Sequence, residues 1–175
     1  MAKKAGNYPL PNHSQNHNHA APRDSEVEEL LRKAEVLLKE NEPRKALDLI
    51  SRSRIHSPWV TNALGVCQLR LGQAKIAVEA FRGLVLGAGG IQLRSDVPPV
   101  FKANFAVALL KADNMDGFLS TVAELSAEEH PAATRLKTAI EGWKKSLTMW
   151  QRLNWYLGGL PATPLTLDFP LGDLT

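Results

Sequence analysis

The sequence predicts an all-α protein: an array of antiparallel helix hairpins, then a long capping helix and an extended tail. Three observations support this fold class. Prolines at Pro43 and Pro58 stand where helices begin. Ala46 and Ala77 lie 31 residues apart, and each is followed four residues later by a large apolar side chain. The stretch 59–84, which includes Ala77, contains a complete hairpin pattern.

Length and composition are those of an ordinary globular chain. The 175 residues are 44% hydrophobic and 22% charged. A net charge of +3 is too small and too evenly spread to indicate a nucleic-acid partner. The sequence has no run of about 18 apolar residues, so we expect no transmembrane helix. The basic N-terminus lacks the apolar core of a secretory signal. We therefore expect a cytoplasmic protein.

The first 22 residues form the first of three predicted regions. They are rich in Asn, His and Pro and hold few apolar side chains, so we expect residues 1–22 to be disordered. Their histidines, His13, His17 and His19, indicate low complexity rather than a metal site. A helical domain is expected over 23–157, and an extended apolar tail over 158–175.

The first hairpin is predicted by its capping residues. Ser25 and Glu28 match the capping box that starts a helix, which we expect to run to about Glu40. Pro43 suits the first position of the next helix. That helix carries Ala46 at the position that Ala77 takes in the following hairpin.

The second hairpin shows how its two helices would pack. Leu64 and Gly65 place a large residue beside one without a side chain, which allows another helix to cross closely. Gly72 permits the left-handed exit that ends the first helix. Ala77 then faces inward where only a methyl group fits, and Phe81 fills the space one turn later.

This stretch resembles the tetratricopeptide (TPR) repeat, whose pattern is W-x2-L-G-x2-Y followed by A-x3-F. Trp59 opens the match, and Gln68 departs from it where the pattern has Tyr. The resemblance extends more weakly over about residues 25–125. It implies a right-handed array of about three helix pairs and a non-enzymatic adaptor that binds a protein segment on the concave face.

A third hairpin is predicted beyond a glycine-rich connector, 87–90, which we interpret as a plain loop because it lacks the Lys-Ser/Thr of a phosphate-binding loop. Asp96 and Pro99 start the hairpin. Phe118 stands in the position of Ala77, so a bulky ring replaces a methyl group. We expect this pair either to be splayed or to end the array.

A long helix over 131–157 is predicted next, after a capping box at Ser126. Apolar residues at spacings of four and three form its seam, which suits the capping of a terminal repeat: Leu136, Ile140, Trp143, Leu147, Trp150 and Leu157. The tail that follows is apolar and interrupted by prolines, so it should pack against something. Our hypothesis is that residues 160–175 fold back into or beside the groove.

No catalytic or metal-binding pattern occurs. The motifs H-E-x-x-H, C-x-x-C and G-x-S-x-G are missing from the sequence, and His56 and His130 fall between predicted helices. Cys67 lies among apolar neighbours, as a small core residue does. We expect no enzyme activity and no cofactor.

The candidate site is the groove that the TPR resemblance implies. The first helix of each pair lines it, giving an apolar floor with amides and a cationic edge that suits a peptide backbone and a carboxylate: Arg32, Trp59, Asn62, Val66, Arg70, Val100, Asn104, Val107 and Lys111. Some TPR domains hold chaperone C-termini with a five-residue carboxylate clamp. Of the matching positions here only Asn104 fits, which disfavours that partner.

Two alternatives remain open. One is a small TPR chaperone that shields a secreted or assembling substrate. The other is a peripheral membrane module, because aromatic and basic residues share the helix 131–157: Trp143, Lys144, Lys145, Trp150, Arg152, Trp155 and Tyr156. The narrow seam favours internal packing over a membrane. Partner identity and oligomeric state stay open.

Overall fold

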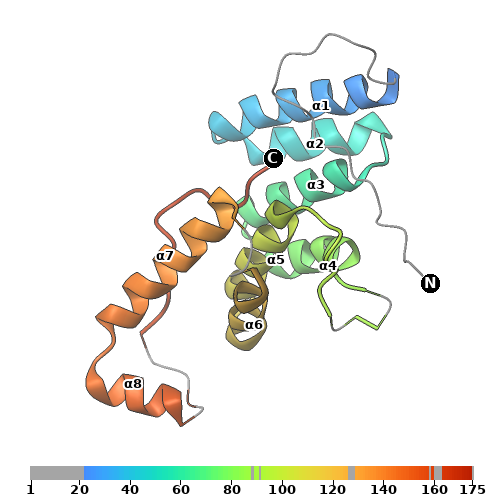
Figure 1. Cartoon of the computed structure of the whole chain (residues 1–175). Coiled ribbons are helices and arrows are strands. Elements are labelled where there is room, and N and C mark those ends of the chain that lie inside the picture. The colour runs from blue at the N-terminus through green and yellow to red at the C-terminus, as the bar shows by residue number, and fades with distance from the viewer. Residues whose placement is uncertain are drawn as a thin grey trace, which may run out of the picture.

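The computed structural model describes residues 22–87, 89–90, 92–125, 129–157, 159 and 163–174. This part of the chain is all-helical and contains no strand, as predicted (Figure 1). The expected disordered region lies outside it except for Pro22, and so does Ser126 of the second capping box. The eight helices are α1 Pro22–Lys39, α2 Pro43–Ser53, α3 Pro58–Arg70, α4 Ala74–Val85, α5 Pro99–Lys111, α6 Met115–Leu125, α7 Pro131–Ser146 and α8 Met149–Tyr156.

The helices pack as neighbouring pairs. Each of α1 to α5 contacts the next helix along the chain, and α7 packs against both α5 and α6. Contacts also join α1 to α3, α3 to α5, and α5 to α7. The first helices of successive pairs therefore lie beside one another, and helical packing continues past the third pair.

Local sequence signals explain where most helices begin and end. Pro43 and Pro58 each occupy the start of a helix, and the Ser57 hydroxyl accepts a hydrogen bond from the Val60 N–H at 3.2 Å. Gly72 has a φ of +74° and ends α3, as predicted. The predicted start at Ser25 is wrong: α1 begins at Pro22, because a proline suits the first turn as well as a capping serine does.

The packing predicted for the second hairpin is confirmed. Ala46 and Ala77 are fully buried. A Cβ atom built on Gly65 would lie 2.5 Å from the ring of Phe81, so a side chain at residue 65 would collide with it. The Leu-Gly pair of α3 and the Ala-x3-Phe pair of α4 thus interlock. In the third pair Phe118 is also fully buried.

The single long helix predicted over 131–157 is wrong. The chain leaves helical geometry at Leu147, whose φ of −70° and ψ of 137° are extended. Thr148 then caps a new helix. Gln151 completes the capping box, because its Oε1 accepts a hydrogen bond from the Thr148 N–H at 2.8 Å. The break turns Trp150 outward to 80% exposure, whereas Trp143 stays buried.

Figure 1 shows how the helices are arranged: α1 to α6 gather together, α7 leads away from them, and α8 lies at its far end. Within the described residues, no helix is both long enough and apolar enough to cross a membrane. Residues 163–174 run along α7 toward α3.

Candidate binding site

The C-terminal segment, defined here as residues 163–174, packs along the helical domain. Its backbone is extended, and it returns beside α7 to reach α3 (Figure 1). Leu165 and Leu174 are buried, and Leu167, Phe169 and Leu171 are partly buried against the core. The hypothesis that the apolar tail folds back is confirmed for these residues.

Residues 171–174 pack on a surface that we call the α3–α5 face. It joins one side of α3 to one side of α5, and most of its side chains are buried: Trp59, Asn62, Val66, Arg70, Val100, Asn104 and Val107. All seven belong to the groove predicted from the sequence. The structure therefore brings them together on two adjacent helices.

Asn104 holds the segment by both ends of its side-chain amide. Its Oδ1 accepts a hydrogen bond from the Asp173 N–H at 2.9 Å, and its Nδ2 donates to the Asp173 carbonyl oxygen at 2.7 Å. The amide pairs with this residue as a neighbouring strand would. Nδ2 also donates to Oδ1 of Asn62 at 2.8 Å, which joins α5 to α3.

Asn62 extends this contact along α3. Its Nδ2 donates to the carbonyl oxygens of Asp173 and Leu174, each at 3.2 Å. The side chain of Asn62 is fully buried, so these bonds replace the water that it would otherwise bind. The two asparagines together form a connected polar network within an apolar surface.

Arg70 completes the ladder two turns further along α3. Its Nε donates to the Leu171 carbonyl oxygen at 3.0 Å, and Nη2 donates to that of Gly172 at 3.2 Å. Nη1 donates to the carbonyl oxygen of Leu38 in α1 at 2.9 Å. The Leu38 carbonyl oxygen also accepts from the Asn41 N–H at the end of α1. One guanidinium therefore links α1, α3 and the segment.

Side chains of the segment add shape and charge to this backbone contact. Gly172 has a φ of +77°, and a Cβ atom there would lie 3.0 Å from Cγ2 of Val66. The carboxylate of Asp173 forms an ion pair with Arg135 of α7. The α3–α5 face therefore fits a small residue followed by an acidic one and a buried leucine.

One buried donor on this face has no partner among the described residues. The segment runs from the Arg70 end of α3 toward its N-terminus, and Trp59 lies one turn beyond Asn62 in that direction. The Trp59 ring packs edge-on to Phe101 with centroids 4.8 Å apart, while its Nε1 is buried without a hydrogen bond. An acceptor there would remove a cost of about 1 to 3 kcal/mol.

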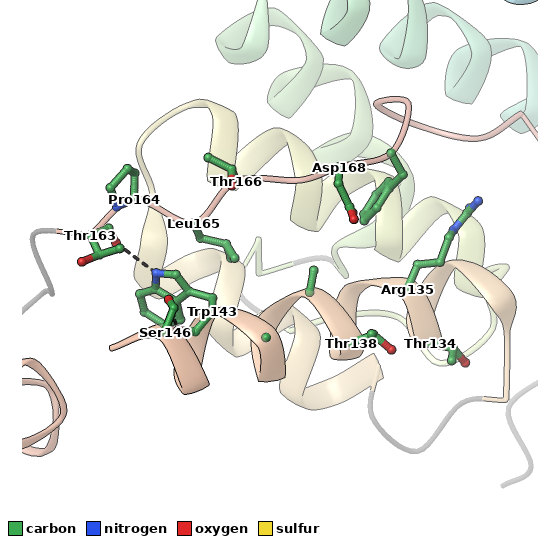
Figure 2. A pocket seen from close by; sticks show the side chains of 13 residues that line it. Thr134, Arg135, Thr138, Trp143, Ser146, Thr163, Pro164, Leu165, Thr166 and Asp168 are labelled. Carbon is green, nitrogen blue, oxygen red and sulfur yellow. Dashed lines mark hydrogen bonds between the residues drawn. The ribbon is translucent and has the colours of Figure 1, made fainter. Parts of the chain in front are cut away.

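Between its two ends the segment leaves a cleft against α7 (Figure 2). Trp143 Nε1 donates to the Thr163 carbonyl oxygen at 2.9 Å and holds the far end. The cleft measures about 830 Å³, and Thr134, Thr138 and Ser146 are among the residues that line it. The segment is thus attached at both ends, and the cleft lies between its middle part and α7.

Two predicted groove residues lie elsewhere. The Arg32 guanidinium donates to Glu29 of its own helix at 2.9 Å, because residues three apart face each other on a helix. Lys111 is exposed at the end of α5. The cation that meets the segment's carboxylate is Arg135, which the sequence did not single out, since its position depends on where α7 crosses α5.

Chemistry at Cys67 is suppressed by its surroundings. Burial raises the pKa of its thiol to about 11, so the thiol stays protonated at neutral pH and lacks the nucleophilic form. In the part of the chain that the structure describes, no group of three His, Cys, Asp or Glu side chains could hold a metal ion.

Comparison of the chain with protein-family models, with curated proteins and with solved structures finds no match.

Proposed function

We propose that this chain is a non-catalytic adaptor, a TPR-like array of about three helix pairs, that binds an extended segment of another protein on the α3–α5 face. The observation that supports it is the hydrogen-bond ladder from Asn62, Arg70 and Asn104 to the backbone of residues 171–174. Donors aimed at carbonyl oxygens hold an extended chain whatever its side chains are.

Selectivity comes from the three positions at which side chains matter. A ligand that follows the C-terminal segment carries a small residue beside Val66, a carboxylate for Arg135 and a buried apolar residue in the place of Leu174. This defined pattern favours an adaptor over a chaperone, because a chaperone for varied substrates needs a broad, adaptable apolar surface.

In this function the C-terminal segment is an internal competitor. Being part of the same chain, it is present at an effective concentration on the order of millimolar. A partner must therefore contribute contacts beyond those of residues 171–174 in order to displace it. The cleft beside α7 and the Nε1 of Trp59, which has no partner among the described residues, are places where a longer segment gains such contacts.

Binding of a labelled peptide with the sequence of residues 169–175 tests the proposal. Fluorescence anisotropy should show weak binding to the full-length chain and stronger binding to a Gly172→Val variant, whose own segment no longer fits against Val66. Adding Asn62→Ala and Asn104→Ala to that variant should abolish binding. Equal affinity with and without the two asparagines would contradict the proposal.

A further inference from the structure

The outward face of α8 is apolar and uncovered. Met149 and Trp150 are 87% and 80% exposed, and Leu157, directly after the helix, is 79% exposed. With 100° between successive residues, these three and the half-exposed Leu153 fall within an arc of about 100° on the helix surface. Large apolar side chains gathered in this way mark an interaction surface rather than scattered exposure.

The opposite face fixes α8 to the protein. Trp155 packs edge-on to Trp143 with centroids 5.4 Å apart, and Gln151 Nε2 donates to Oγ1 of Thr163 at 2.8 Å. The exposed residues are therefore not the loose end of an unattached helix. Figure 1 shows α8 at the far end of α7, away from α1 to α6, so its outer face is free to meet a flat partner.

Basic side chains lie close to α8, two at the end of α7 and one within α8 itself. Lys144 and Lys145 are exposed at the end of α7, and Lys144 Nζ lies 5.0 Å from the ring centre of Trp155. Arg152 is also exposed, and its guanidinium donates to the carbonyl oxygens of Lys145 and Leu147. No acidic residue occurs from 142 to 167.

We infer that the outer face of α8 is a contact surface for a bilayer that carries anionic lipid. Tryptophan and leucine side chains beside lysines and arginines suit the boundary between headgroups and acyl chains. Trp150 and Leu153 enter that boundary, while Lys144, Lys145 and Arg152 meet the lipid phosphates. The outer face of α8 is separate from the α3–α5 face. It would therefore hold the protein at a membrane and leave the α3–α5 face available for the proposed binding of a protein segment.

Co-sedimentation of the full-length chain with vesicles tests the inference. We expect pelleting with vesicles of phosphatidylcholine mixed with phosphatidylserine, weaker pelleting at high salt, and none with phosphatidylcholine alone. The exposed Trp150 should also shift its fluorescence to shorter wavelength on binding, a change that Trp150→Phe removes.

Matched variants distinguish binding through this surface from non-specific adsorption to vesicles. Trp150→Ala with Leu153→Ala should abolish pelleting, and Lys144→Gln with Lys145→Gln should lower the partition coefficient roughly 25-fold, since each basic residue near an anionic surface contributes about fivefold. Ile76→Ala and Lys75→Gln replace exposed residues of α4, away from α8, and should leave the partition coefficient unaltered.

Three results would overturn the inference. The first is no pelleting with anionic vesicles, and the second is pelleting that survives the α8 variants. The third is a dimer in sedimentation velocity that Trp150→Ala dissociates, because the face would then be covered by a second copy of the chain.

Discussion

Asn104 is the single residue on which the contact with the C-terminal segment most depends. It satisfies both backbone groups of Asp173 and bonds to Asn62, and it is buried. A side-chain amide carries an acceptor oxygen and a donor NH2 group side by side, so it can pair with both backbone groups of one residue. The sequence indicated that Asn62 and Asn104 face a peptide backbone, and the structure places the chain's own backbone there.

Replacing Asn104 with alanine should lower the free energy of unfolding by about 2 to 4 kcal/mol, because the Asp173 N–H and Oδ1 of the buried Asn62 lose their partner. The Asp173 carbonyl oxygen keeps only its bond from Asn62. Chemical denaturation measures the change. Lys111→Ala, an exposed substitution in the same helix, should stay within about 0.5 kcal/mol of the native chain. Equal stability of the two variants would contradict the assigned role.

At the scale of helices, the crossing of α3 over α4 at Gly65 shows how closely paired helices approach. The Phe81 ring occupies the space that a side chain on residue 65 would need. The packing of α3 on α4 therefore depends on the fit of one glycine against one aromatic ring, as the hairpin pattern predicted.

Gly65→Ala should destabilise the protein by about 1 to 3 kcal/mol through overpacking against Phe81. Gly83→Ala is the matched control, since a Cβ atom there meets no atom within 4 Å and lies inside α4. That variant should gain about 0.5 to 1 kcal/mol from helix propensity. Thermal or urea unfolding compares them, and a shift in the same direction for both would refute the close crossing.

Helix boundaries show how far the sequence could predict the fold. The starts at Pro43 and Pro58 and the end at Gly72 follow from local backbone chemistry, and they were predicted. The break at Leu147 was missed because apolar periodicity continues across it. The signal was present in Thr148 and Gln151, which form a capping box with the same mechanism as the one expected at Ser25.

For the molecule as a whole, the C-terminal segment links helices that are distant in sequence. Arg70 joins it to α1 and α3, Asn104 to α5, and Arg135 to α7. The sequence predicted that the tail packs, because free apolar segments are unfavourable in water. It could not predict Arg135 as the ionic partner, since this depends on three-dimensional crossing rather than on spacing along the chain.

In the proposed function, residues 171–174 occupy a binding face that a segment of another chain can take over. Hydrogen exchange at the Asp173 amide tests it most directly, because this N–H is bonded to Asn104. In the full-length chain the amide should be protected, and an excess of free peptide with the sequence of residues 169–175 should remove that protection. Protection that remains unchanged when the peptide has saturated its site would contradict the claim.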